Sequence, residues 1–70
     1  MKVNMRNYSH GETIRIIREW TELTQKEFAK KINKSKRTIE QYEANKIDYN
    51  ISTLLRIAEE FNINIILEKK

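Results

Sequence analysis

The chain has 70 residues, enough for one small domain with a modest core, and its lack of cysteine and single histidine exclude disulfides, thiolate chemistry and histidine–cysteine metal sites. The longest apolar run, Ile65-Ile66-Leu67, is too short to cross a bilayer and the N-terminus has no signal-peptide pattern, so we expect a cytoplasmic protein without membrane, metal or cofactor. The net charge of +4 lies between Thr24 and Lys46, where seven basic side chains outnumber three acidic ones, which is typical of a solvated lysine-rich surface or of a nucleic-acid-binding protein.

The first predicted helix begins at a capping box. Ser9 and Glu12 stand at the N-cap and the third helical position, where each side chain can accept a hydrogen bond from the backbone N–H of the other. Apolar residues then recur at helical spacing. We therefore expect a helix over residues 10–21.

Two further helix starts follow in close succession. A second capping box begins at Thr24 and predicts a helix over residues 25–32. After a connection of two residues, Ser35 is the N-cap of a helix expected over residues 36–44. Two short helices joined so tightly indicate a helix-turn-helix, which we place at residues 24–45.

Asparagine is expected to end three of the helices, because it is the usual substitute for glycine where the chain enters the left-handed region. The three positions are Asn33, Asn45 and Asn62. Asn50 is the expected N-cap of a last helix over residues 51–61. The apolar periodicity of this helix predicts an inner face formed by Ile51, Leu54, Leu55, Ala58 and Phe61.

The C-terminal segment, residues 63–69, has a different pattern. Its isoleucines are β-branched, and its side chains alternate between two sides, which predicts a β-strand: one side has Ile63, Ile65 and Leu67, and the other has Asn64, Ile66 and Glu68. The strand needs a hydrogen-bonding partner, which is either the segment Met1 to Met5 or the same strand of a second chain. The other alternative is that the last helix simply extends. We favour a dimerisation strand, with an interface formed by Ile63, Ile65, Ile66 and Leu67.

The two sides of the helix over residues 36–44 differ in chemistry. A helical wheel places Ile39 and Tyr42 toward the core, with Thr38 beside them and Glu43 at the border. The opposite side presents a guanidinium, an amide, an ammonium and a carboxylate, from Arg37, Gln41, Lys36 and Glu40. In a DNA major groove, arginine or lysine reaches guanine and glutamine pairs with adenine. An ordinary polar surface is the plainer interpretation, but the tight turn before this helix favours DNA.

The run from Thr24 to Lys46 resembles the Cro/C1-type helix-turn-helix family of transcriptional regulators. The positions in register are Thr24-Gln25, Phe28-Ala29, Ile32, Ser35, Thr38-Ile39, Glu43 and Lys46. With the apolar residues of the following helix, the resemblance covers residues 14–63. It implies a mostly helical domain over residues 1–70, with four helices arranged as in lambda repressor and a short C-terminal strand paired across a dimer.

The resemblance also implies roles for individual residues. Base contacts are expected from Lys36, Arg37 and Gln41. Phosphate contacts are expected from Gln25, Ser35, Thr38, Asn45 and Lys46. Arg18 and Glu43 match a partly buried salt bridge between the first and third helices, which we interpret as structural.

Glu40 departs from what the resemblance implies for a side that faces DNA. Three roles are open to it: it accepts from cytosine N4 as a further base contact, it repels a phosphate, or it holds Arg37 or Lys36. The turn also departs, because Asn33 replaces a glycine and Lys34 replaces a small apolar residue.

The order of the last helix, Asn62 and an alternating strand is similar to the HipB-type antitoxins, whose terminal strands pair across the dimer axis. That similarity implies a HipA-like kinase toxin as partner and repression of the chain's own operon.

We therefore predict a homodimeric repressor that binds an inverted repeat in double-stranded DNA. The alternative is a protein-interaction module with a vestigial helix-turn-helix. An enzyme is disfavoured, and no residue is predicted to be catalytic, because the chain has one histidine, no cysteine and no glycine-rich phosphate loop.

Overall fold

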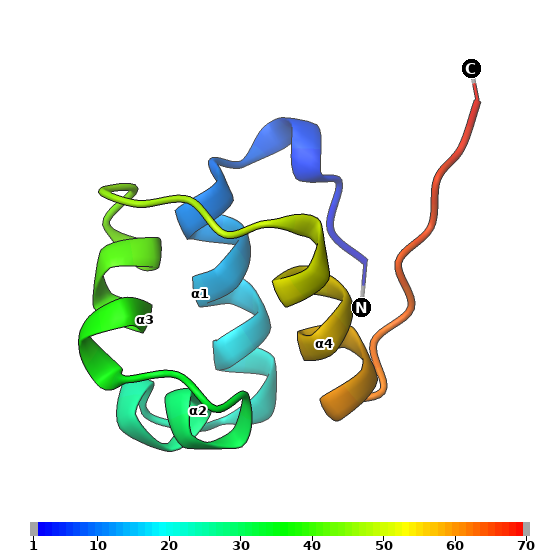
Figure 1. The fold of residues 1–70 in the computed structure, drawn as a ribbon. Coiled ribbons are helices and arrows are strands. Elements are labelled where there is room, and N and C mark those ends of the chain that lie inside the picture. The colour runs from blue at the N-terminus through cyan, green and yellow to red at the C-terminus, as the bar shows by residue number, and fades with distance from the viewer. Residues whose placement is uncertain (1, 70) are drawn as a thin grey trace.

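The computed structural model describes residues 2–69, so that Met1 and Lys70, the two ends of the predicted domain, lie outside the described part. Four α-helices follow a short 3-10 helix, η1 (Met5–Asn7): α1 (His10–Thr21), α2 (Gln25–Lys31), α3 (Lys36–Glu43) and α4 (Ile51–Glu60). Each α-helix is confirmed to within one residue of its predicted end. Figure 1 shows α2 and α3 on one side of α1, and α4 with the C-terminal segment on the other. None of the described helices is long and apolar enough to span a membrane.

The predicted helix starts are present as hydrogen-bonded caps. In both capping boxes, at Ser9 and at Thr24, the hydroxyl accepts from the backbone of the third helical residue and that residue's carboxylate accepts from the cap N–H. Ser35 and Asn50 cap α3 and α4 through their side-chain oxygens. These bonds satisfy backbone donors that a helix leaves unpaired at its first turn.

The predicted asparagine terminators adopt the left-handed conformation, with φ of 58° at Asn33, 58° at Asn45 and 55° at Asn62. After each asparagine, the next N–H returns to the carbonyl five residues earlier and closes a Schellman motif. The three N···O distances are 2.8 Å for Lys34 to Ala29, 2.9 Å for Lys46 to Gln41 and 2.8 Å for Ile63 to Ala58. Glu22, which follows α1, is also left-handed at φ 59°, and no residue pattern predicts this conformation there.

The core is a single cluster that all four α-helices share. Its buried apolar side chains are Ile14, Ile17, Phe28, Ala29, Ile32, Ile39, Tyr42, Leu54 and Ile57. Phe28 of α2 stacks on Phe61, just after α4, with ring centroids 5.1 Å apart. This stack joins the helix-turn-helix to the last helix.

The predicted inner face of α4 was wrong at two positions. Ile51 and Leu55 are 65% and 53% exposed, whereas Leu54 and Ile57 are buried. The reason is that apolar residues span about 160° of the circumference of this helix, a wider stripe than the core contacts, so periodicity alone leaves its rotation open. Packing against the core decides the rotation and leaves Ile51 and Leu55 on the surface.

The C-terminal segment leaves α4 in an extended conformation along the side remote from α3 (Figure 1). The turn at Asn62 rules out the alternative in which α4 continues. Within residues 2–69, the segment forms no strand, and the alternative pairing with the N-terminal residues is not found there. Ile63 packs against the core, but Ile65, Ile66 and Leu67 are 39%, 65% and 95% exposed.

Candidate nucleic-acid interface

The turn between α2 and α3 brings the two helices into close contact. Ala29 of α2 is buried, and its carbonyl accepts the N–H of Lys34 in the turn. A side chain as small as alanine allows the two helix backbones to approach each other there. The outer side of α3 is thereby held at the surface of the molecule, at the left of Figure 1.

The outer side of α3 carries the side chains that the wheel placed there. Lys36, Arg37 and Glu40 are exposed and Gln41 is half-buried, whereas Ile39 is buried in the core. The Nζ of Lys36 lies 3.5 Å from the Oε1 of Glu40, so Glu40 pairs with Lys36 in the free protein. Arg37 forms no ion pair with any residue in the range 2–69, and its guanidinium is free to meet a ligand.

The start of α3 presents two hydroxyl groups. Ser35 Oγ accepts from the backbone N–H of Thr38 at 3.1 Å, and the two hydroxyl oxygens lie 2.9 Å apart. Ser35 is exposed and Thr38 is half-buried. Together with Lys36, these groups place hydrogen-bond donors at the N-terminal end of α3, of the kind that bind phosphate oxygens.

An ion pair fixes α3 against α1. Arg18 donates to Glu43 from Nε at 2.7 Å and from Nη2 at 3.0 Å, and its Nη1 donates to the carbonyl of Leu23 at 3.1 Å. The side chains are 18% and 8% exposed. The hydrogen bonds that Arg18 donates to the carboxylate of Glu43 raise the pKa of Arg18 further above its already high ordinary value. Gln25 Nε2 donates to Glu43 Oε1 at 3.4 Å, so the first residue of α2 also braces α3.

The loop after α3 is tied to the start of α1 by a contact that the sequence analysis missed. The N–H of Gly11 donates to Asn45 Oδ1 at 2.9 Å, and Asn45 Nδ2 donates to Ser9 Oγ at 3.2 Å. A Cβ at Gly11 would collide with the backbone carbonyl oxygens of Tyr42 and Glu43, so only glycine fits. The signal was available, because the chain's one glycine stands inside a helix, where alanine is the better helix former.

This tie bears on two of the predicted phosphate contacts. The side chain of Asn45 is used within the protein, and its N–H donates to the carbonyl of Tyr42 at 3.1 Å. Lys46 has its N–H bonded to Gln41, but its side chain is exposed beside α3. Asn45 therefore positions the loop, and Lys46 is the residue there with a free charge.

A second contact holds the same loop from its other end. His10 Nδ1 lies 2.9 Å from Asp48 Oδ1, and the hydroxyl of Tyr49 donates to the carbonyl of His10 at 3.0 Å. Burial raises the pKa of Tyr49 above its ordinary value. The loop between α3 and α4 is thus fixed to α1 on both sides of Lys46.

Known proteins match both the sequence and the structure. The family model described as helix-turn-helix matches residues 14–67. A HipB variant in complex with an O2 20mer superposes with a TM-score of 0.66 at 25% identity, covering 99% of this chain and 94% of that chain. HipB in a HipA-HipB-O2-O3 complex gives 0.65 at 25% identity, covering 99% and 96%. No curated protein sequence matches significantly.

Proposed function

Because the chain belongs to the Cro/C1-type helix-turn-helix family, we propose that it is a transcriptional repressor that binds an inverted-repeat operator as a homodimer. One observation carries the proposal. The outer side of α3 presents an unpaired guanidinium, an ammonium and an amide on a helix that α1 and α2 hold rigidly through Glu43. Such a helix fits a DNA major groove, where these groups distinguish base pairs.

Base reading is assigned to Lys36, Arg37 and Gln41. Arg37 is the strongest candidate, because no carboxylate among residues 2–69 has to be displaced before it pairs with guanine. Lys36 is held by Glu40, so the carboxylate of Glu40 must leave Lys36 if it is to accept from cytosine. Phosphate contacts are assigned to Gln25, Ser35, Thr38, Asn45 and Lys46, and Asn45 also holds the loop to the start of α1.

Dimerisation is assigned to the C-terminal segment, residues 63–69. Its extended backbone has no ladder partner among residues 2–69, and three of its apolar side chains are exposed. Pairing with the same segment of a second chain would satisfy the backbone groups and cover Ile65, Ile66 and Leu67. In the resulting dimer, the two α3 helices would read half-sites separated by about one helical turn.

A toxin partner is the finer part of the proposal. The similarity to HipB in a complex that contains HipA supports a HipA-like kinase as the partner of this chain. In that arrangement the protein acts in the cytoplasm as an antitoxin, and the pair represses its own operon. The role is one of binding rather than of catalysis.

The experiment is a selection of genomic DNA fragments by the purified protein at about 150 mM salt. We expect one inverted repeat to be enriched, above all upstream of the protein's own gene. Alanine at Lys36, Arg37 or Gln41 should each cost about 1–3 kcal/mol and relax preference at particular base pairs, whereas Lys46→Ala should weaken all sequences alike. Equal losses on all sequences from all four variants would contradict the assignment of base contacts.

A protein-interaction module is the competing function, and the exposed Ile65, Ile66 and Leu67 favour it. On that view the helix-turn-helix no longer binds DNA. Reversing the charges of Arg37 and Lys46 separates the two functions. If the wild-type chain enriches DNA and the charge-reversal variant does not, the repressor is supported. If the wild-type chain enriches no DNA and both chains capture the same protein partner equally well, the module is supported.

A further inference from the structure

Four lysines gather at the junction of α2 and α3, next to the side chains assigned to base reading. Lys26 and Lys30 lie one turn apart on α2, Lys34 follows in the turn, and Lys36 opens α3. They line one open groove together with Ala29 and Asn33. We call this surface the lysine groove.

The positive charge of the lysine groove is largely uncompensated. Only Lys36 forms an ion pair with a residue of the described range, and its partner is Glu40 of α3. Glu27, the acid of α2, is directed to the helix start, where its carboxylate accepts from the N–H of Thr24 at 3.0 Å. Like charges held together repel each other in the free protein, and a bound anion would relieve that repulsion.

The lining of the groove indicates which kind of anion it fits. Apart from the buried Ala29, its residues are lysines and one asparagine. Protein interfaces draw most of their affinity from aromatic and large apolar anchors, and the groove lining offers none. A polyanion that needs only charge and hydrogen-bond donors matches better, and the phosphate backbone of DNA is such a polyanion.

The position of the groove relates it to the proposed DNA site. Lys36 belongs both to the groove and to the outer side of α3, so the two surfaces are continuous. A duplex with α3 in its major groove has a phosphate strand along each edge of that groove. The strand that passes the first residue of α3 would run along the lysine groove.

We propose that Lys26, Lys30 and Lys34 bind phosphates of the DNA strand that passes the N-terminal end of α3. This inference rests on the proposed function and adds three electrostatic contacts to it. The contacts raise affinity for every sequence, and base selection stays with Arg37 and its neighbours on α3.

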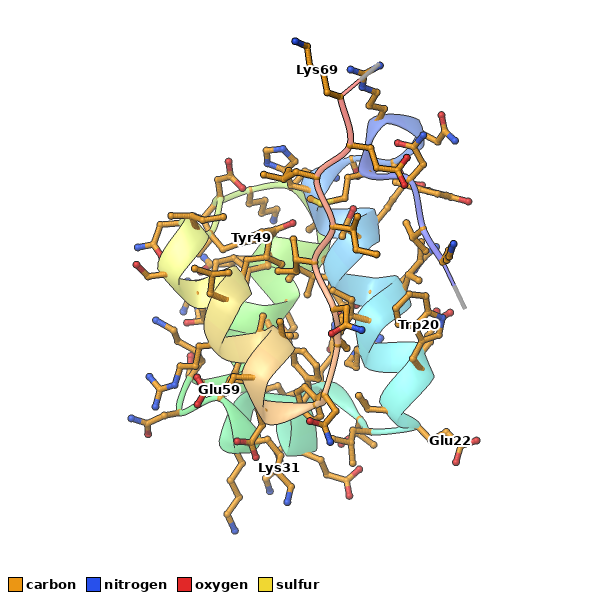
Figure 2. The ribbon with its side chains drawn as sticks, turned by 90° about the vertical axis from the view of Figure 1, so that its right-hand side faces the viewer. Trp20, Glu22, Lys31, Tyr49, Glu59 and Lys69 are labelled. Atoms are coloured by element: carbon orange, nitrogen blue, oxygen red, sulfur yellow. The ribbon has the colours of Figure 1, made fainter. Side chains whose placement is uncertain are left out.

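The first test is the salt dependence of DNA binding for single variants, Lys26→Gln, Lys30→Gln and Lys34→Gln. Losing one phosphate contact should reduce the slope of log affinity against log salt by about 0.9 per chain. Lys31→Gln is the matched control, because it removes the same charge from the same helix. Lys31 lies in a different hollow, with Trp20, Phe61 and Ile63, on the side shown in Figure 2.

The second test locates the contacts on the DNA. Single phosphates of the selected operator are replaced by neutral methylphosphonates, and each duplex is measured with the wild-type chain and with the triple glutamine variant. We expect neutral linkages at the strand beside the start of α3 to weaken wild-type binding while leaving the triple variant unaffected. Circular dichroism of each variant verifies that the fold is retained.

The outcomes separate this inference from the proposed function. Reduced slopes for the three variants, with equal loss on operator and random duplex and no change for Lys31→Gln, support the inference. Slopes equal to that of the Lys31→Gln control overturn the inference. It is also overturned if the three variants bind DNA unchanged but no longer bind a protein partner that the wild-type chain binds. A wild-type chain that enriches no DNA sequence overturns the proposed function itself. If the chain selects an operator through Arg37 but the lysine variants keep the wild-type salt slope, only the role of the lysine groove is refuted.

Discussion

The guanidinium of Arg18 and the carboxylate of Glu43 are both largely removed from water, and each satisfies the charge of the other. Glu43 also accepts from Gln25, and Arg18 also donates to the carbonyl of Leu23. The pair therefore ties α3 to α1 and to the start of α2. Removing one partner would leave a buried charge without compensation, which costs more than the pair contributes by itself.

We expect Arg18→Met to lower the free energy of unfolding by about 3 kcal/mol, because the carboxylate of Glu43 is left buried and unpaired. The double variant Arg18→Met, Glu43→Leu should lose clearly less, since both charges are gone. Urea denaturation followed by circular dichroism measures both. A double variant as unstable as the single one would show that the pair acts through packing alone.

Glu22 is the only left-handed residue among residues 2–69 that is neither asparagine nor glycine. Its Cβ makes this conformation unfavourable, whereas glycine adopts it freely. We expect Glu22→Gly to raise stability by about 0.5–1 kcal/mol, which corresponds to a rise in Tm of a few degrees. Glu22→Ala is the control, because alanine keeps the Cβ, and an equal rise in Tm for alanine would refute the explanation.

At the scale of the element, all four helix starts and the ends of α2, α3 and α4 are set by residues at those positions. The capping boxes start α1 and α2, and the asparagines that follow α2, α3 and α4 end them. Hydrogen bonds from the cap residues lower the pKa of Glu12 and of Glu27, from the backbone N–H and the hydroxyl of Ser9 and Thr24 respectively. The ionised carboxylates are therefore part of both helix starts.

These lowered pKa values predict loss of stability in acid. A carboxyl group whose pKa is lower in the folded chain stabilises the fold fully above its ordinary pKa of about 4.5, and this contribution disappears as the pH falls through the lower, folded value. We expect the Tm of wild type to fall below about pH 4.5. The double variant Glu12→Gln, Glu27→Gln should show a shallower fall.

Glutamine is a suitable replacement because its carbonyl can still accept from the cap N–H. The comparison therefore isolates ionisation from loss of the capping box. Thermal unfolding of both proteins between pH 7 and pH 2.5 measures the difference. Parallel curves for the two proteins would mean that other carboxyl groups govern the acid transition.

For the whole molecule, α3, which we propose to bind DNA, and the C-terminal segment, which we propose to pair two chains, lie on opposite sides of α1 (Figure 1). The outer side of α3 and the lysine groove are on one side, and the extended segment after α4 is on the other. Figure 2 shows this segment running in front of α1 and α4. Pairing of two chains through it would leave both α3 helices free to face DNA.

We expect removal of residues 65–70 to convert a dimer into a monomer, because the exposed Ile65, Ile66 and Leu67 are lost while Ile63 stays in contact with the core. Affinity for the inverted repeat should fall by about 100-fold or more, since the two half-sites are no longer bound together. Sedimentation and DNA titration measure the two effects. Removal of residues 68–70 alone should change neither the dimer nor the affinity, and a dimer that survives the longer truncation would place the interface elsewhere.

The sequence alone determined where the helices lie. Capping boxes and Schellman asparagines act through hydrogen bonds between residues at most five positions apart, so their chemistry can be read without knowledge of the fold. The outer side of α3 was also predictable, because its polar and apolar residues separate clearly on a wheel. The exception is Glu22, whose side chain gives no preference for the left-handed conformation that α1 needs in order to end.

Only the tertiary structure decided the features that depend on residues far apart in the chain. It fixed the rotation of α4, which left Ile51 exposed, and the contact of Gly11 with Asn45, 34 positions away. It also joined the lysines of α2 and α3 into one groove, and it left the C-terminal segment without a ladder partner within residues 2–69. Local hydrogen bonds select helices, but the burial of apolar surface is shared by all the elements, so the arrangement of the elements is settled only when they pack together.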